Sequence, residues 1–534
     1  MIRQVDGGTQ RVARLRRWAV RGGIACLVLE VVYLIVGNLC INKGVLESVI
    51  NYHPEADFVS WESAVTYFPG FLSFKGFTYR SQSMNSQMSV HIAEVDARIS
   101  LTGLMFKKVH IWGVDARNVE YRHRDRLDFP CWTEESGTPP PEMPSDIDFY
   151  PEIPGFENPP DPKPEDLYPR DEEARPWTVK ISGARIEGAV RVAYNEARLD
   201  GQGFVGGGLT VVLGKTNAID RGRVRVVPAT VLLGPTLLTN DLDLDVDVRV
   251  KPFSTVCSDQ SEIIAGLSGT LTFAGRESNG FSLNVAALDP LLPGQGVLSI
   301  TSGTGELGGH LEVREGILES GRLDLVADEV VLEHQEVPLQ GDLEVHAAFA
   351  KRALETGRFD VSGTTFRLDD VVNTQHSAAK QEKLDPWFCN LEFEEGTLTF
   401  GEPMALDSRV RVKMHDTRPV VALLRNFTNQ LKWLSLTRNA KSIDGTMDLD
   451  FGKGFVAVDD LRLFGENVEI LGWVHIRDQK KYGRIFARHG ARAAGVAFDG
   501  GVGKVVTFRP RHWFDKQQGV PSEGDQSAPP EAVE

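Results

Sequence analysis

Glycine-rich and acidic segments are the places in this chain where a cofactor or metal site would first be sought. The pattern GxGxxG occurs twice, over Gly201–Gly206 and over Gly303–Gly308. A dinucleotide site requires that loop between a strand and a helix whose N-terminus meets the pyrophosphate. Strand-like sequence follows both motifs here, and the chain contains 52 glycines in all. Both motifs are therefore interpreted as turns.

Other catalytic patterns are missing from the sequence. Gly503-Lys504 lacks the earlier glycine and the following Ser or Thr of a P-loop, and no HExxH, GxSxG or paired-histidine motif occurs. Aspartates alternate along Asp241–Asp247, which would suggest calcium, but the alternation of a β-strand explains their spacing without a ligand loop. The sequence therefore predicts a protein that is not an enzyme and that uses no metal and no cofactor.

The residues most able to bind a ligand are apolar and alternate with charged ones. Over Asp241–Val250 the sequence DLDLDVDVRV gives a strand with one apolar face and one acidic face. If this face lines a groove, it would hold apolar chains. The candidate lining residues are this row and the analogous positions of two later segments: Leu242, Leu244, Val246, Val248, Val250, Leu323, Leu325, Leu343 and Val345.

Alternating segments of this kind recur every ten to fifteen residues, with Gly, Asp and Asn between them. The pattern predicts a mainly β protein with roughly 25–30 short strands, nearly all joined as antiparallel meanders. The predicted organisation is a basic N-terminus (1–21), an apolar helix (22–41), a first β module (42–129), a proline-rich insert (130–176), a repetitive β region (177–415), an amphipathic helix (416–436), a C-terminal β module (437–514) and a tail (515–534).

Two segments interrupt the β pattern. Residues 130–176 contain 13 prolines and 13 acidic side chains, so they cannot supply the N–H donors of a strand or bury a core. They are interpreted as a disordered loop, with a polyproline ligand as the alternative. Residues 419–436 have apolar side chains at helical spacing after Pro419, which predicts an amphipathic helix that caps an apolar sheet face or touches a membrane. The tail is also predicted to be disordered.

Residues Gly22–Ile41 are long and apolar enough to cross a bilayer, since twenty helical residues span roughly 30 Å. A retained anchor is favoured over a cleaved signal peptide, because no small-x-small cleavage site follows. Positive charge before the helix places the N-terminus in the cytoplasm. The residues that set this orientation are Arg11, Arg14, Arg16, Arg17 and Arg21.

Charge and cysteine content exclude two classes of protein. Residues 42–534 hold 52 basic and 72 acidic side chains, a net charge of −20, which argues against nucleic acid as a partner. Three cysteines lie far apart after the anchor, so a disulfide-built fold is excluded. One basic segment near the C-terminus would meet anionic lipid or an acidic partner, or would simply be a solvated strand edge. Its main residues are Lys480, Lys481, Arg484, Arg488 and Arg492.

Several segments of the chain resemble AsmA-like proteins, the group of inner-membrane-anchored periplasmic proteins of Gram-negative bacteria that includes TamB. The resemblance is carried by the module at 90–124, VHIAEVDARISLTGLMFKKVHIWGVDARNVEYRHR, with its hydrophobic turn at Leu101–Phe106. The strand starts at Pro176-Trp177 and Pro386-Trp387 and the C-terminal segments GTMDLDF, VAVDDLRLFGENVEILGWVHI and VVTFRPRHWF are similar to that group as well.

The resemblance implies a single-pass inner-membrane protein whose periplasmic part is a long, incompletely closed β-groove. Its apolar interior would carry phospholipid acyl chains and contribute to phospholipid transport or outer-membrane biogenesis, with an outer-membrane or envelope protein as a further partner. The alternative is a non-catalytic anchored scaffold or adaptor for envelope assembly, in which every apolar face is packed against another. Alternation alone leaves both open, because inward residues look alike whether they meet each other or a lipid.

Overall fold

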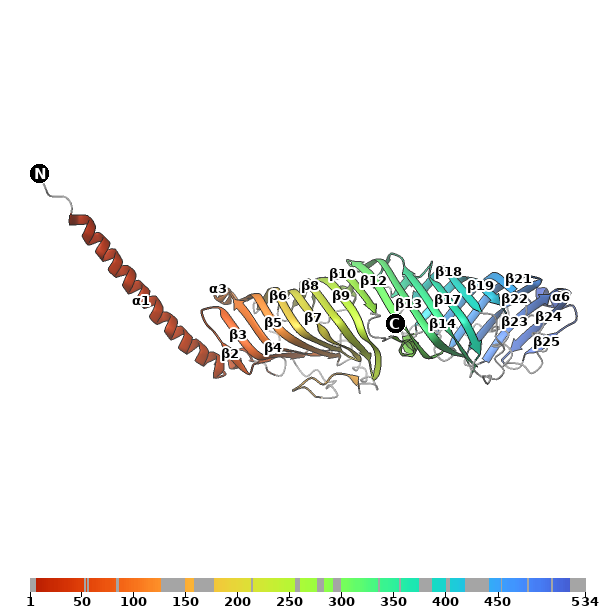
Figure 1. Cartoon of the computed structure of the whole chain (residues 1–534), viewed down its shortest axis with the longest axis horizontal. Helices are drawn as coiled ribbons and strands as arrows, with labels where there is room; N and C mark the ends of the chain where they lie inside the picture. The colour runs from red at the N-terminus through yellow and green to blue at the C-terminus, as the bar shows by residue number, and fades with distance from the viewer. Residues whose placement is uncertain are drawn as a thin grey trace, which may run out of the picture. The chain divides into compact units, whose positions relative to one another are not determined.

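The computed structural model describes most of the chain, with gaps that include the larger part of 126–176 and all of 418–440. The described residues are 6–51, 54, 57–82, 86–125, 149–157, 177–212, 215–254, 260–275, 283–291, 299–334, 337–354, 357–373, 387–399, 404–417, 441–452, 454–477, 480–500 and 503–518. They are mainly β, as predicted, and their strands run from β1 to β25 (Figure 1).

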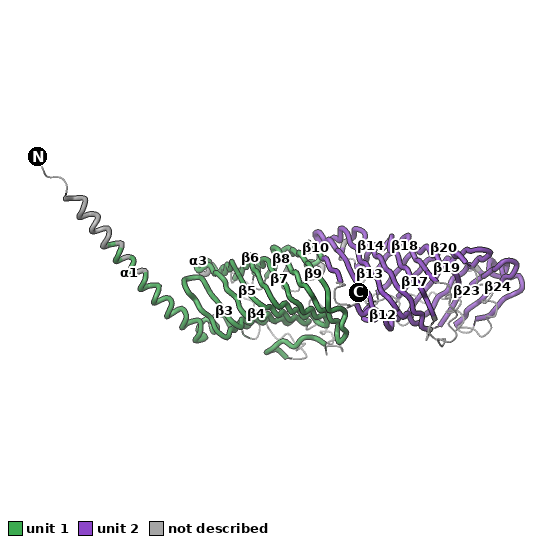
Figure 2. Tube along the Cα trace, viewed as in Figure 1, with its two compact units in different colours: residues 1–271 green, residues 272–534 purple. Residues whose placement is uncertain are grey.

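The chain divides into two compact units, residues 1–271 and 272–534 (Figure 2). The boundary falls within β10 (Leu267–Gly275), inside the region 177–415 that was predicted to be one repetitive block. The first unit contains α1 (Asp6–Asn42), α2 (Val45–Ile50), β1 (Asp57–Ser60), β2 (Ser63–Val65), β3 (Phe71–Gln82), β4 (Ser86–Ile99), α3 (Leu101–Leu104), β5 (Lys108–Asp125), β6 (Thr178–Tyr194), β7 (Ala197–Val212), β8 (Thr216–Leu233), β9 (Thr236–Ser254) and α4 (Gln260–Gly266).

The strands of the first unit lie side by side in chain order. Both β1 and β2 pair with β3, and β3 to β9 then follow one another. The pairings of these strands are antiparallel, as predicted for nearly all of them, except that β5 and β6 are parallel. Their connection contains the proline-rich insert. Because β6 runs in the same direction as β5, this connection must bring the chain back from the last residue of β5 to the level of its first residue. No local pattern in the two strands encodes that choice.

The second unit continues as antiparallel strands. Its elements are β11 (Leu283–Asn284), η4 (Val285–Leu291), β12 (Ser299–Arg314), β13 (Ile317–His334), β14 (Val337–Phe349), β15 (Arg352–Ala353), β16 (Arg358–Asp360), β17 (Thr365–Asn373), β18 (Phe388–Thr399), β19 (Ala405–Asp416), β20 (Lys441–Gly452), β21 (Phe455–Gly465), β22 (Val468–Arg477), β23 (Lys480–His489), β24 (Arg492–Asp499), β25 (Lys504–Val506) and α6 (Pro510–Gln518). Residues 515–518 of the predicted tail are thus helical.

Many strands are much longer than the short strands predicted, up to 19 residues in β9. The difference arises because Gly and Asn residues, which are typical of turns, also occur at bulges inside strands. Asn118 of β5 has φ +55°, and its Oδ1 accepts a hydrogen bond from Ala189 N of β6 at 2.9 Å. Beside it Gly188 has φ +105°, and an added Cβ would lie 2.5 Å from that same oxygen. Such bulges bend and twist the strands without ending them.

The glycines of the two GxGxxG motifs also lie inside strands. Gly201, Gly203 and Gly206 lie within β7, and Gly303, Gly305 and Gly308 lie within β12, so neither GxGxxG is a turn. A Cβ on Gly203 would lie 2.1 Å from the carbonyl oxygen of Arg225 on the neighbouring strand. These glycines allow neighbouring strands to approach closely.

The end of α1 is attached to the edge of the sheet by side-chain amides. Asn38 Nδ2 donates to Thr66 O at 3.0 Å, and its Oδ1 accepts from Thr66 N at 2.9 Å. Asn42 makes the same pair of bonds with the backbone of Ala64, at 2.7 and 3.1 Å. The two side chains replace a neighbouring strand and satisfy the backbone groups of edge strand β2.

The segment predicted to cross a membrane, residues 22–41, lies within α1, as do the five arginines predicted to orient it. Within the described part of the chain, no helix combines the length and the apolar character that a membrane crossing needs. The predicted amphipathic helix at 419–436 lies outside the described residues.

One part of the proline-rich insert is ordered, which corrects the prediction of disorder there. Residues 149–157 pack on the face of β3 to β5 that carries Arg80 and Arg122, with Ile153 fully buried. Arg122 Nη1 donates to Glu152 O at 2.9 Å, and Arg80 Nη1 donates to Pro154 O at 3.1 Å. Arg124, which is also fully buried, donates to Gln87 Oε1 at 2.8 Å and to carbonyls of this segment. Arginines that bind backbone carbonyls hold the segment without needing particular side chains from it.

Candidate functional site

One face of the first unit carries an apolar row that crosses seven strands. Residues paired across neighbouring strands share a face of the sheet, so the row can be followed through the registers of β3 to β9. We call this the inner face. The row consists of Phe74, Val95, Ala116, Ile186, Val205, Val224 and Val246.

Burial varies along this row. Val95 and Ala116 are buried in a cluster to which Phe74, Ile111 and Ile186 add partly buried side chains. From β6 onward the row is only half-buried, at Ile186, Val205, Val224 and Val246.

Other positions on the same face are more completely buried than this row. Val190 and Ala229 are fully buried, and they lie on β6 and β8 beside the half-buried row. The inner face of β6 to β9 therefore combines a sealed part with an apolar part that the described residues do not cover completely.

The row predicted on β9 divides in the same way. Leu242 and Val250 are buried, whereas Leu244, Val246 and Val248 are half-buried. The register places Val246 opposite Val224, and Leu242 opposite Ala229, on β8. All five residues thus lie on the inner face. The strand predicted over 241–250 is confirmed as part of β9.

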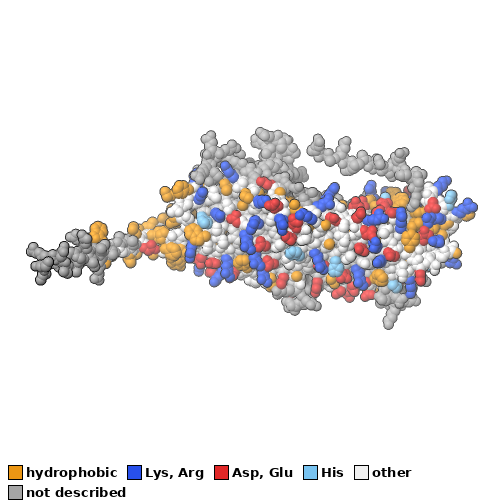
Figure 3. Space-filling model, turned by 90° about the horizontal axis from the view of Figure 1, so that it is seen from above, with side chains coloured by type: hydrophobic (Ala, Val, Ile, Leu, Met, Phe, Trp, Pro, Cys, Tyr) orange, Lys and Arg blue, Asp and Glu red, His pale blue; other side chains and the backbone are white. Residues whose placement is uncertain are grey.

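The opposite face of these strands is charged. Arg223 Nη2 lies 3.2 Å from Asp245 Oδ2, and Arg221 Nη2 lies 3.5 Å from Asp247 Oδ2. The aspartates of 241–247 that would have suggested calcium therefore include two with arginine partners across the strand pair. Figure 3 shows Lys, Arg, Asp and Glu side chains interspersed over the surface it displays. A mixed charged surface of this kind keeps a large sheet soluble.

The second unit has its own apolar row, which includes part of the other predicted set. It crosses eleven strands from β12 to β24. Leu325 and Val345 are direct cross-strand partners in it, and Leu343 pairs with Ala327 one position away on the same face. Leu325 and Leu343 are buried, while Leu323 and Val345 are half-buried. The predicted residues of β13 and β14 therefore form one patch.

The last strands of the second unit bury their apolar side, and α6 covers the opposite side of β23 and β24. Val410 of β19 is 0% exposed, and Val412, Ile485, Val496 and Phe498 are also buried. On the outward face α6 covers β23 and β24, where the rings of Phe514 and Phe486 lie 6.0 Å apart. An added Cβ on Gly495 would lie 2.4 Å from the Trp513 ring, which shows how closely α6 approaches. This part of the sheet is a packed core.

The predicted basic surface is not a single surface. Lys480, Arg488 and Arg492 are exposed, and Arg488 is paired with Glu469 at 2.9 Å. Arg484 is half-buried and donates to Phe498 O at 3.0 Å. Lys481 is only 6% exposed and lies in phase with Ile485 on the packed side of β23, so it is not part of a basic contact surface.

Burial has a chemical consequence at Lys481. Loss of solvation lowers the pKa of its ammonium group to about 7. The sequence contained a signal for this placement, because Lys481 is two residues before Gly483 and four before Ile485, in the phase of the apolar row.

A second polar group lies at the end of the inner face of the first unit and was not identified from sequence. The His123 and Tyr194 rings stack with centroids 4.7 Å apart, joining β5 to β6. Asn195 Nδ2 donates to Asp125 Oδ2 at 2.6 Å. Burial raises the pKa of Tyr121 to about 12, with further contributions from Tyr194 and Asp125. The alternation of VEYRHRD places Tyr121 and His123 on one face, which was the available signal.

The described residues contain no group of three or more His, Cys, Asp or Glu side chains placed to hold a metal ion. Burial raises the pKa of the Cys389 thiol to about 12, which suppresses the nucleophilic thiolate.

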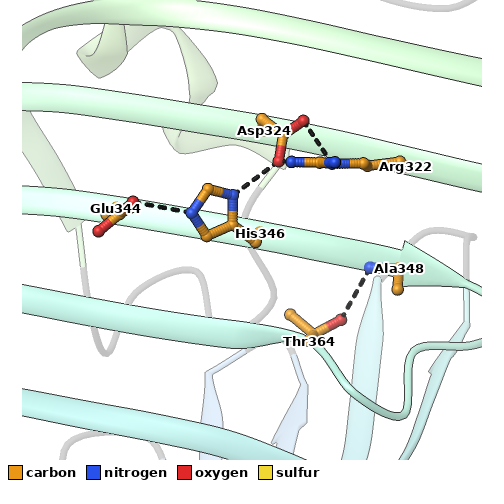
Figure 4. A network of polar contacts seen from close by, with 6 residues as sticks. All are labelled: Arg322, Asp324, Glu344, His346, Ala348 and Thr364. Atoms are coloured by element: carbon orange, nitrogen blue, oxygen red, sulfur yellow. Dashed lines mark hydrogen bonds and ion pairs between the residues drawn. The ribbon is translucent and has the colours of Figure 1, made fainter.

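The clearest polar network of the second unit is on the outward face of β13 and β14 (Figure 4). His346 Nδ1 lies 2.6 Å from Asp324 Oδ1, and its Nε2 lies 2.8 Å from Glu344 Oε1. Hydrogen bonds to Asp324 and Glu344 raise the pKa of His346. Each carboxylate contacts a different ring nitrogen, so the arrangement is a charge pair rather than a shared metal site.

We expect Asp324→Asn to lower the pKa of His346, because the strongest hydrogen bond to the charged ring is lost. The folded pKa lies above the usual 6.5, so the stabilisation is fully present below that pH and disappears as pH rises through the folded value. NMR titration of the His346 ring measures the effect, and Glu312→Gln on the same unit, away from the ring, is the control. An unchanged His346 titration in Asp324→Asn would contradict the assignment.

Comparison with protein-family models, with curated proteins and with solved structures finds no match to this chain.

Proposed function

We propose that this chain is a membrane-anchored, non-enzymatic protein whose inner β face holds phospholipid acyl chains in an incompletely closed groove, as the resemblance to AsmA-like proteins implies. The proposal includes an N-terminus in the cytoplasm, α1 in the inner membrane and the strands in the periplasm. The function would be phospholipid transport or outer-membrane biogenesis, with an outer-membrane or envelope protein as a further partner.

The observation that carries the proposal is the half-buried apolar row on β6 to β9. Ile186, Val205, Val224 and Val246 lie in the middle of long strands, where a sealed sheet would bury them fully. Relative to water, an acyl chain gains about 0.8 kcal/mol for each methylene that it buries, so ten fully buried methylenes would give roughly 8 kcal/mol. No polar group within the row would need to lose its hydration.

The anchoring part of the proposal is supported by the surface of α1. Its apolar side chains are exposed around the helix, among them Ile24, Leu27, Leu29, Ile35 and Leu39. A helix that exposes large apolar residues on every side is typical of an apolar environment. The arginines that precede this stretch favour the cytoplasmic side of a membrane.

Site-specific photo-crosslinking of the full chain in its membrane tests the lipid groove. A photoreactive phenylalanine analogue at position 246 or 224 is expected to form phospholipid adducts, detected by mass spectrometry. The same analogue at position 245 or 225, the neighbouring positions on the charged face, is expected to form none. Adducts of equal yield at all four positions, or none at 246 and 224, would overturn the proposal.

The alternative, an anchored scaffold or adaptor for envelope assembly, is favoured by a different observation. The strands β19 to β24 are packed on their apolar side, and α6 covers part of the outward side. The apolar side chains of these strands are already covered, so they would gain little from contact with a lipid tail. Protein adducts in place of lipid adducts at positions 246 and 224 would support this second function.

A further inference from the structure

The turn between β2 and β3 lies beside the last part of the apolar stretch of α1, where Asn38 bonds the backbone of Thr66. Tyr33 Oη lies 2.8 Å from Thr66 Oγ1 and 3.4 Å from Phe68 O. Tyr33 is eight residues before Ile41, where the stretch predicted to cross the membrane ends. A Cβ on Gly37 would lie 3.3 Å from Thr66 Cγ2 and 3.6 Å from the Tyr33 ring, so Thr66 and the end of that ring are level with Gly37. At about 1.5 Å per residue, the turn therefore begins roughly 6 Å inside that end of the apolar stretch.

Exposed apolar side chains are gathered at this level. Tyr67 and Phe68 of the turn are exposed, and Met105 and Phe106, which follow α3, are 84% and 62% exposed. Leu101 of α3, also exposed, lies beside Gly70, where a Cβ would be 3.9 Å from its Cγ. We call Tyr67, Phe68, Leu101, Met105 and Phe106 the apolar tip. Figure 3 shows apolar side chains gathered where α1 meets the strands.

The backbone groups at the sheet edge beside the tip are paired with side chains of α1 instead of facing solvent. Strand β2 is an edge strand, and its outward N–H and C=O groups at Ala64 and Thr66 are satisfied by Asn42 and Asn38 of α1. In a bilayer each unsatisfied backbone group costs several kcal/mol, so an edge strand is tolerated there only when such groups are paired.

Cationic residues border the apolar tip. Lys107 and Lys108 follow Phe106 directly, and Lys43 follows α1; all three are exposed. Aromatic residues with lysines beside them are the composition of a membrane interface, where the lysines reach anionic headgroups.

We propose that the apolar tip enters an anionic phospholipid bilayer beside α1, so that the end of the inner face at β3 to β5 meets the hydrocarbon region rather than water. This inference rests on the anchoring part of the proposed function and adds to it a point of lipid entry. Phe74 and Val95, the first residues of the apolar row, lie on the strands adjoining the tip. A lipid tail could then pass from the bilayer to the inner face without crossing water.

The test places an environment-sensitive fluorophore at the tip. Met105→Cys is made in the full chain with its five own cysteines replaced by serine, labelled with NBD and reconstituted into vesicles of phosphatidylethanolamine and phosphatidylglycerol. The control is Glu196→Cys, an exposed position in the turn at the other end of β6. The 17 residues of β6 separate the two ends by roughly 50 Å.

Lipids with a doxyl quencher on the acyl chain are expected to quench the label at position 105, with a blue-shifted emission, and not the label at position 196. Chain that sediments with vesicles while neither label is quenched would overturn tip entry but keep the anchor. Chain that fails to sediment with vesicles would overturn both. The result does not depend on whether the inner face carries lipid, so failure of the lipid-groove proposal is recognised separately by the crosslinks at position 246.

A paired substitution tests the purpose of tip entry. Met105→Glu with Phe106→Glu is expected to abolish quenching of a label at Leu101→Cys and to lower the yield of lipid crosslinks at position 246. The control is Lys75→Glu with Glu94→Gln, two exposed positions on the charged face of β3 and β4. Unchanged crosslink yield in the tip variant with lost quenching would show that lipid enters elsewhere and would overturn this role.

Discussion

Val246→Asp is expected to remove bound phospholipid from the chain without unfolding the first unit. Val246 is half-buried in the middle of β9, opposite Val224. On a face that is not sealed, a new carboxylate keeps much of its hydration and makes the row unfavourable for an acyl chain. In a sealed core the same carboxylate would lose its hydration at a cost of several kcal/mol and would unfold the surrounding strands.

Two matched variants make the Val246→Asp result interpretable. Asp245→Asn is the neighbouring position on the charged face, where Asp245 pairs with Arg223, and it is expected to keep the lipid. Val410→Asp is placed where the side chain is 0% exposed, and it is expected to unfold β19 and its neighbours. Lipid extraction with mass spectrometry gives the occupancy, and hydrogen exchange of the strand amides reports folding.

Each contrary result has a definite meaning. Loss of protection in Val246→Asp as severe as in Val410→Asp would show that β9 belongs to a sealed core and would favour the scaffold. Retained lipid in a folded Val246→Asp variant would show that lipid binds elsewhere.

Lys481→Met is expected to stabilise β22 to β24 by about 2–4 kcal/mol at pH 6 and by little at pH 10. Burial lowers the pKa of Lys481 from 10.5 to about 7, and each unit corresponds to about 1.36 kcal/mol. The expected gain in stability is set below the value that this pKa difference alone would give, because Lys481 also makes an interaction in the folded chain that methionine would lose. Because the folded pKa is below the unfolded one, the cost of burying the ammonium is complete below pH 7 and disappears as pH rises to 10.5.

Hydrogen exchange of the β22 to β24 amides at several pH values measures this effect locally, since a chain of two units need not unfold in one step. Lys480→Met, the exposed neighbour, is the control and is expected to change stability little at any pH. A destabilised Lys481→Met at pH 6 would mean that the lysine is held by interactions stronger than its loss of hydration.

Strand pattern and sheet connectivity differ in how far they follow from sequence. Asp241–Val250 alternates for ten residues, and its assignment to one strand is confirmed because β geometry turns successive side chains to opposite faces. The parallel pairing of β5 and β6 could not be predicted, because it depends on where the connection through 126–177 returns the chain. Strand length was underestimated because glycines of the GxGxxG motifs, such as Gly203 and Gly305, are typical of turns but lie within strands.

The sequence by itself determined which residues share a face. The period of two groups Leu242, Leu244, Val246, Val248 and Val250 on one side of β9, whatever lies opposite them. Only the tertiary structure decided which of them are covered, because burial depends on the strands and loops that face a residue from elsewhere in the chain. The same reason explains Lys481, whose charge suggested a contact surface until its neighbours placed it inside.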